Sequence, residues 1–341
     1  MFRAIILLFI FPLQSLAYPV GVIDREYHDV ARDRALRLYI WYPSSSHSPA
    51  TVFDNNPSFH GFTAIKDAPF APGRFPLILL SHGSGGNRAS LAWLATQLAE
   101  QGAVVIALNH PGSTTGHSIP SENIKAWQRP RDVSFVLDQV LKTSEFARMI
   151  DTGRIAVIGH SLGGYTALAT IGVTLRLDAF RQYCVDFPLH ADCEFNRLGG
   201  IKPASVEKRL FEGNYSDARI AAVVAITPAY ARSFDEQQLG RLNKPVLIIG
   251  ATDDQEIPNE LHARYLSSHI PHQGVYAEIK GAGHFGFLPL CRANALAILK
   301  REGEEKICLD PVHKDRRQVH RETFVLIQDF LQRLGFLKTK Q

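Results

Sequence analysis

The sequence lacks several features that would indicate other classes of protein. Its 341 residues contain no Cys-x-x-Cys pair, no His-Glu-x-x-His segment and no lysine-bearing phosphate loop, so neither a metal nor a cofactor is expected. Neither sign of charge is in large excess, because the net charge is +4 and is not gathered into one block. The charge pattern therefore gives no indication of a nucleic-acid partner.

Long apolar runs are also missing, and the one near the N-terminus is short. Met1-Phe-Arg3 supplies a positive charge, an apolar run extends from Ala4 to Leu13, and Ser15-Leu-Ala17 forms a small-x-small cleavage site. A helix that crosses a bilayer needs roughly 20 apolar residues. We therefore expect residues 1–17 to be a secretory signal and the mature chain, without a transmembrane segment, to be periplasmic or secreted. No cysteine follows the run, so a lipid anchor is not expected.

Cysteine is scarce, with four residues in the chain. Export permits disulfides, and four cysteines allow three pairings. Short loops separate Cys184 from Cys193 and Cys291 from Cys308, so we favour these two pairs. Four buried free thiols remain the alternative.

What the chain does contain is a repeated alternation of apolar strands and amphipathic helices. This pattern predicts an α/β fold in which residues 18–341 form one domain around a mostly parallel, doubly wound sheet of about eight strands. We expect residues 22–30 and 36–42 to form an antiparallel hairpin at the sheet edge, and residues 44–73 to be an irregular connection. The alternation breaks at residues 175–217, which predicts an inserted cap over the strand ends; an excursion packed on the side of the sheet is the alternative.

One stretch predicts a catalytic nucleophile. Residues 155–158 indicate a buried strand, residues from 162 onward indicate a helix, and Gly159-His-Ser-Leu-Gly163 joins them. So sharp a bend crowds the positions two before and two after Ser161, and both are glycine. The bend would expose the Ser161 hydroxyl and aim the Leu162 amide at a developing negative charge. A serine that merely caps a helix is the alternative.

A serine hydroxyl needs a histidine base, which in turn needs a carboxylate. His284 lies in a glycine-flanked turn directly after the last predicted strand, where its ring could reach Ser161. Three acidic residues, Asp253, Asp254 and Glu256, follow the preceding predicted strand. We choose Asp254 as the acid, with Asp253 as the alternative.

The chain resembles the α/β-hydrolase superfamily. The matching segments are residues 75–87, 109–112, 159–164, 254–258 and 283–285, and the resemblance extends roughly from Leu36 to Leu334, nearly the whole mature chain. More narrowly, it resembles the secreted platelet-activating-factor acetylhydrolases and the bacterial proteins called predicted dienelactone hydrolases. The resemblance implies an acyl-enzyme at Ser161 and an oxyanion hole formed by the backbone amides of Ser84 and Leu162. Dienelactone hydrolases use a cysteine nucleophile, so that substrate is not expected here.

The sequence thus predicts an exported serine hydrolase that acts on small-molecule carboxylic esters with a short, medium or lipid-like acyl group. Hydrolysis of amides, peptides or thioesters would use the same residues, and a catalytically silent binding protein is the alternative of a different class. Aromatic side chains at six positions are candidates for the acyl pocket, although most aromatics belong to the core. They are Phe62, Trp127, Tyr165, Tyr230, Phe285 and Phe287.

Overall fold

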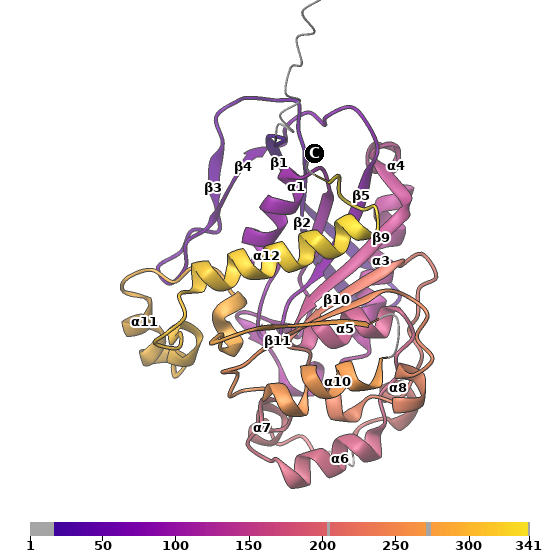
Figure 1. Ribbon diagram of the computed structural model, residues 1–341, viewed down its shortest axis with the longest axis vertical. Coiled ribbons are helices and arrows are strands. Elements are labelled where there is room, and N and C mark those ends of the chain that lie inside the picture. The colour runs from indigo at the N-terminus through magenta and orange to yellow at the C-terminus, as the bar shows by residue number, and fades with distance from the viewer. Residues whose placement is uncertain (1–16, 203–204, 271–273, 340–341) are drawn as a thin grey trace, which may run out of the picture.

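A ten-stranded sheet forms the centre of the computed structural model, which describes residues 17–202, 205–270 and 274–339 (Figure 1). The expected signal segment lies outside the described residues, apart from Ala17. The strands run in the order β12-β11-β10-β9-β5-β6-β2-β1-β4-β3. Their bounds are β1 (Val20–Asp29), β2 (Arg34–Pro43), β3 (Thr51–Phe53), β4 (Phe62–Lys66), β5 (Phe75–Ser81), β6 (Val104–Leu108), β9 (Ile150–His160), β10 (Ala222–Ile226), β11 (Val246–Ala251) and β12 (Gly274–Ile279).

Six neighbouring strands, from β6 to β12, are parallel, so the predicted α/β fold is confirmed. Every residue of β5, β6, β10 and β11 is buried. Continuous apolar sequences of this kind are typical of parallel strands that are covered on both faces.

Alternate residues of each strand enter two separate cores. Leu77 and Leu79 of β5 face one core, and Ile78 and Leu80 face the other. The first core is covered by α3 (Gln128–Lys142), α5 (Leu162–Thr170) and α10 (Ala263–His269). The second is covered by α1 (Ala92–Glu100) and α12 (Arg316–Arg333), the long yellow helix of Figure 1. The sheet is therefore doubly wound.

The N-terminal part differs from the prediction in one respect. The segment expected to be irregular contributes β3 and β4, and β4 pairs in parallel with β1. The predicted hairpin of β1 and β2 is therefore present but does not form the sheet edge, and the sheet has ten strands instead of about eight. The β4 pairing joins distant residues, which local sequence patterns do not reveal.

The described part of residues 175–217, the predicted cap insertion, contains helices α6 (Leu177–Asp186), α7 (Ala191–Leu198) and α8 (Lys208–Phe211). In Figure 1 they lie together at the end of the molecule beyond α10. Contacts between this segment and the rest of the chain include an isolated bridge between Leu175 and Phe234, and hydrogen bonds from the Ala191 amide to the Glu256 carbonyl (3.2 Å) and from the Tyr230 amide to Asp192 (2.8 Å).

Short elements complete the described chain. They are α2 (Pro120–Asn123), α4 (Ser144–Met149), α9 (Glu236–Leu239), α11 (Ala295–Glu302), the ribbon of β7 (Ser113–Thr114) and β8 (His117–Ser118), and the 3₁₀ turns η2 (Ala231–Ser233), η3 (Asn259–Leu261), η4 (His284–Phe287) and η5 (Glu305–Cys308). None of the described helices has both the length and the apolar character needed to cross a membrane.

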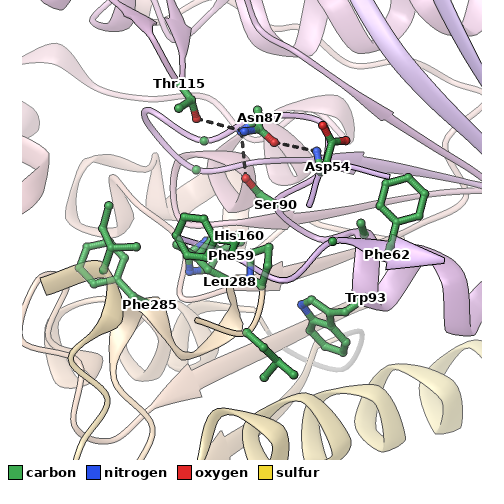
Figure 2. A pocket seen from close by; sticks show the side chains of 18 of the residues that line it. Asp54, Phe59, Phe62, Asn87, Ser90, Trp93, Thr115, His160, Phe285 and Leu288 are labelled. Atoms are coloured by element: carbon green, nitrogen blue, oxygen red, sulfur yellow. Dashed lines mark hydrogen bonds between the residues drawn. The ribbon is translucent and has the colours of Figure 1, made fainter. Parts of the chain in front are cut away.

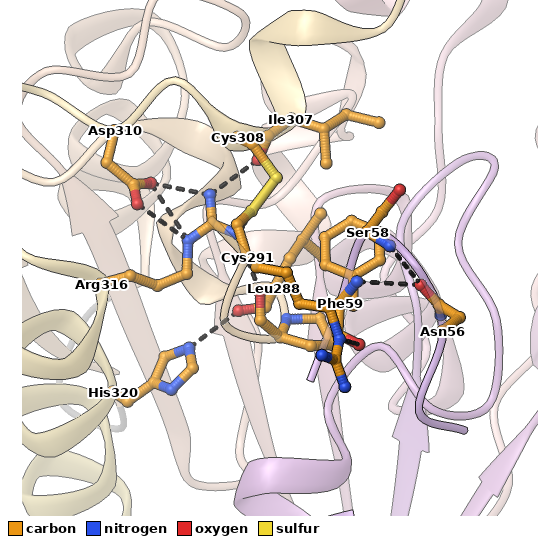
Figure 3. The surroundings of a disulfide bond; sticks show 12 residues. Asn56, Ser58, Phe59, Leu288, Cys291, Ile307, Cys308, Asp310, Arg316 and His320 are labelled. Carbon is orange, nitrogen blue, oxygen red and sulfur yellow. Dashed lines mark hydrogen bonds and ion pairs between the residues drawn. A yellow bond between two sulfur atoms is a disulfide. The ribbon is translucent and has the colours of Figure 1, made fainter. Parts of the chain in front are cut away.

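Both predicted disulfides are confirmed: Cys184 pairs with Cys193, and Cys291 pairs with Cys308. The second lies beside the buried guanidinium of Arg316, which donates to Asp310 at 2.7 Å and to the Ile307 carbonyl at 2.7 Å (Figure 3). These contacts fix residues 289–310, which follow η4.

Loss of the Cys291–Cys308 disulfide is expected to destabilise the fold. Replacing both cysteines by serine should lower the free energy of unfolding by about 3 kcal/mol, because the bond closes a loop of 17 residues. Denaturant unfolding of the variant and of wild type, both with the Cys184–Cys193 disulfide formed, measures the difference in the free energy of unfolding. An unchanged free energy of unfolding would show that the bond does not constrain this segment.

Candidate active site

Ser161 occupies the bend between β9 and α5. Its φ of +56° is rare for a residue with a side chain and is maintained by crowding on both sides. A Cβ at Gly159 would overlap the Gly163 carbonyl, and one at Gly163 would overlap the Ser81 carbonyl. The Ser161 amide also donates to the Ile226 carbonyl at 2.9 Å, so β10 helps to hold the bend.

Three predicted site residues meet at this bend. His284, the first residue of η4 after β12, places Nε2 3.0 Å from the Ser161 hydroxyl oxygen and Nδ1 2.7 Å from Oδ2 of Asp254. In the neutral ring, Nδ1–H donates to the carboxylate and Nε2 accepts from the hydroxyl. All three residues are at most 8% exposed. The arrangement is continuous from carboxylate to hydroxyl.

The alternative acid does not reach His284. Asp253 is exposed and accepts a hydrogen bond from Thr252, its neighbour (3.0 Å). Asp254 is buried, and its Oδ1 accepts from the amides of Glu256 (3.0 Å) and Ile257 (2.8 Å). These two bonds leave Oδ2 directed at the imidazole.

The surroundings of His284 strengthen its affinity for a proton. Burial lowers the pKa of the imidazole, but the charge of Asp254 and its hydrogen bond outweigh burial and raise the pKa above the ordinary value of 6.5. The ring is therefore a stronger base than a free histidine, and Asp254 stabilises its protonated form.

The loop after β5 lies against Ser161. A Cβ on Gly83 would lie 3.2 Å from the Ser161 Cβ, so the backbone that leads to Ser84 passes directly beside the hydroxyl. The Ser84 side chain is exposed and bonds Asn123 at 3.0 Å. Within the described part of the chain, neither the Ser84 amide nor the Leu162 amide donates to another residue. Both donors are available to a ligand.

Beneath this loop lies a buried arginine that sequence reasoning missed. Arg129 of α3 donates to the His82 carbonyl in the loop, to the Ser113 hydroxyl at 2.9 Å and to the Thr166 hydroxyl in α5 at 3.2 Å. Burial lowers the pKa of its guanidinium to about 9, which leaves it charged at neutral pH. Arg129 thus connects the loop after β5 to the helix that carries Ser161.

A second buried group supports the same loop. Asp132, one turn after Arg129, accepts two hydrogen bonds from Arg34, at 2.8 and 2.6 Å, and one from His110 Nδ1 at 3.0 Å. Burial lowers the pKa of His110 to about 3, so its ring is neutral and its Nε2 accepts from the Ser81 hydroxyl at 3.0 Å. Arg129 and Asp132 are three residues apart in α3, on the same face as the apolar residues Val133, Val136 and Val140, and this spacing was the signal that could have revealed the network.

Ser161 and His284 line a cavity of about 1340 Å³. Figure 2 shows other side chains of its wall, among them His160 and Phe285. Of the six predicted aromatic candidates, Phe62, Tyr230 and Phe285 line it, whereas the other three are buried in the core. Four residues of α7 also line it: Ala191, Asp192, Phe195 and Asn196. Among the described residues, no group of three or more histidine, cysteine or acidic side chains is arranged to hold a metal.

The chain is similar to several known ester-cleaving proteins. It is 27% identical over 212 residues to Cutinase est2 of Thermobifida alba, covering 61% of this chain and 52% of the relative. It is 25% identical over 230 residues to the bis(hydroxyethyl) terephthalate hydrolase of Streptomyces coelicolor, covering 67% and 56%. The match thus spans little more than half the length of these relatives. A ferulic acid esterase from Streptomyces cinnamoneus has a similar structure, with a TM-score of 0.62 at 21% identity over 97% of this chain and 96% of that one.

The parallel sheet and the serine at a cramped strand-to-helix bend define the class: an α/β protein with a Gly-x-Ser-x-Gly turn after a central strand. The model of the alpha/beta hydrolase family matches residues 77–293, and the chain belongs to that family. The resemblance inferred from the sequence is therefore confirmed at the level of the superfamily. The narrower likeness to acetylhydrolases stays a prediction.

The crowding around Ser161 predicts the effect of adding one methyl group. Gly163→Ala should lower the free energy of unfolding by about 3 kcal/mol, because the new Cβ would displace the Ser81 backbone of the central strand β5. Gly240→Ala is the matched control, since its Cβ would lie 3.5 Å from the nearest atom in helical backbone. Thermal unfolding compares them, and equal stability of the two variants would contradict the crowding.

Proposed function

We propose that this protein is an exported serine hydrolase that cleaves carboxylic esters through a covalent acyl-enzyme on Ser161. The observation that carries the proposal is the pair of hydrogen bonds from Asp254 to His284 and from His284 to Ser161, at 2.7 and 3.0 Å. Membership in the alpha/beta hydrolase family supports it. The similarity to a cutinase and to a bis(hydroxyethyl) terephthalate hydrolase also supports it.

In the first half of the reaction, the Ser161 oxygen attacks the ester carbonyl carbon while His284 Nε2 takes the hydroxyl proton. The carbonyl oxygen becomes negatively charged and is stabilised by the backbone amides of Ser84 and Leu162. Asp254 stabilises the imidazolium that forms. The imidazolium then donates its proton to the departing alkoxide, so an alcohol leaves and the acyl group stays on Ser161.

In the second half, water replaces the alcohol. His284 takes a proton from water as its oxygen attacks the acyl carbon, the same two amides stabilise the oxyanion, and the proton passes to Ser161 as the acid leaves. The enzyme returns to its starting state with no other reactant. No step requires a metal or an organic cofactor.

Further observations support the finer parts of this proposal. The two disulfides fit an oxidising compartment, as the signal-like N-terminus does. We also propose that residues 175–217 form a cap, because α7 contributes part of the cavity wall beside Ser161. The substrate is a small-molecule or lipid-like ester.

The proposal predicts which bond type is cleaved and which residue is essential. Purified protein should hydrolyse p-nitrophenyl esters faster than matched thioesters or anilides, and Ser161→Ala should lower kcat by about 10⁶-fold while the melting temperature stays near that of wild type. A folded Ser161→Ala variant that retains wild-type turnover would refute the proposal. Faster cleavage of anilides than of esters would instead identify an amidase.

The pH dependence follows from the raised pKa of His284. The ring must be neutral to accept a proton, so kcat/KM should fall as the pH drops through that pKa, with the midpoint above pH 6.5. Asp254→Asn should lower kcat by about 10⁴-fold. Asp253→Asn, the matched control one residue earlier, should leave the pH profile unchanged. A midpoint well below 6.5, or reversed effects of the two substitutions, would contradict these assignments.

A further inference from the structure

The cavity at Ser161 continues far beyond the reacting atoms along one face of α1. Trp93, Thr96, Gln97 and Glu100 line it, at the spacing of a single helical face. From Trp93 to Glu100 the helix rises about 10 Å. These four residues are only partly buried, unlike the core face of the same helix. The cavity, which we call the channel, therefore extends from Ser161 along this face of α1.

Two segments far apart in the sequence form the opposite wall of the channel. Residues 47–65, which include β3 and β4, contribute one part, and residues 284–307 contribute the other. They are joined by backbone hydrogen bonds from His60 to Leu290 and from Arg292 to Ser58, both 2.9 Å. The Cys291–Cys308 disulfide holds the second segment (Figure 3). Backbone hydrogen bonds and a disulfide thus hold this wall of the channel in place.

The channel walls are rich in large apolar side chains. Trp93 is fixed in place by its Nε1–H, which donates to the Phe287 carbonyl at 2.8 Å, and by stacking on His320 with 3.9 Å between ring centroids. Figure 2 places Phe62 and Trp93 on one side of His160 and Phe285 on the other. Further apolar walls are Phe59, Leu288, Leu290 and Ile307.

The charges of the channel are of one sign. Among the described lining residues there is no lysine or arginine, whereas six are acidic: Asp54, Glu100, Asp192, Glu256, Glu302 and Glu304. A carboxylate or phosphate on the ligand would therefore meet repulsion from these carboxylates and would find no lysine or arginine among the described lining residues. The volume of about 1340 Å³ also exceeds the roughly 300–1,000 Å³ of a pocket for a compact small molecule.

We propose that this channel binds a long, uncharged apolar chain of the ester substrate, so that the enzyme selects long-chain neutral esters over acetyl esters and over esters whose chain ends in an anion. The proposal rests on the proposed function, because the channel begins at the hydroxyl of Ser161. The chemistry of the walls identifies this substrate class. Each additional methylene group that is buried makes binding more favourable, whereas a negative charge at the end of the chain makes binding less favourable because it would be removed from water.

A chain-length series tests the proposal on wild-type protein. Two series of esters, kept below their micelle concentrations, separate the two halves of the substrate: p-nitrophenyl esters with acyl chains of increasing length, and acetates of alcohols of increasing length. We expect kcat/KM to rise at least tenfold with length in one series, which then identifies the half that enters the channel. The same long chain ending in a carboxylate should be at least tenfold poorer than its methyl-ended counterpart.

A substitution inside the channel tests its location. Thr96 lies on the channel face of α1, and its hydroxyl bonds only within its own helix, to the Ala92 carbonyl at 2.9 Å. Thr96→Trp should lower the ratio of long-chain to acetyl kcat/KM at least tenfold, whereas Thr96→Val should preserve the ratio. Val325→Trp, on the exposed face of α12, controls for an added tryptophan and should leave the ratio unchanged.

The outcomes separate this inference from the proposed function. Acetyl esters that are hydrolysed by Ser161, with a flat or falling length profile in both series, would overturn the channel assignment alone. So would an unaltered ratio in Thr96→Trp, or equal rates for methyl-ended and carboxylate-ended chains. Failure to hydrolyse any ester of any length would refute the proposed function itself.

Discussion

The hydrogen bond between His284 and Ser161 depends on a steric constraint at the nucleophile bend. The serine can adopt its positive φ only because Gly159 and Gly163 leave room for the crossing backbone of β9, α5 and β5. The histidine comes from the turn after β12, and its carboxylate partner from the turn after β11. The parallel sheet brings these turns to one edge, since the strands end together there. The positions of the three side chains thus follow directly from the order and direction of the strands.

Much of this could be predicted from the sequence because the signals are local. The buried strands, the glycine pair around Ser161 and the turn that carries His284 each lie within a few residues of one another. The sequence favoured Asp254 over Asp253 as the partner of His284 but did not exclude Asp253. The choice depends on which carboxylate is buried and on which backbone amides orient it. The sequence therefore predicted which serine and histidine lie together, while Asp253 stayed open as an alternative to Asp254.

The features that local patterns missed are those that join distant segments. β4 pairs with β1 although β2 and β3 lie between them in the chain, and Arg129 connects the loop after β5 to α5. The channel requires residues 47–65 and 284–307 to meet over α1, a contact between segments more than 200 residues apart. Such contacts follow from packing in three dimensions, which neither periodicity nor motif spacing encodes.

The central claim is that the Ser161 hydroxyl is an activated nucleophile, and covalent labelling tests it most directly. The native protein would be treated with a fluorophosphonate and analysed by intact mass and peptide mapping. The account predicts one adduct per chain, located on Ser161, and no adduct on protein unfolded before treatment. An unlabelled native protein, or an adduct on a different residue, would contradict it.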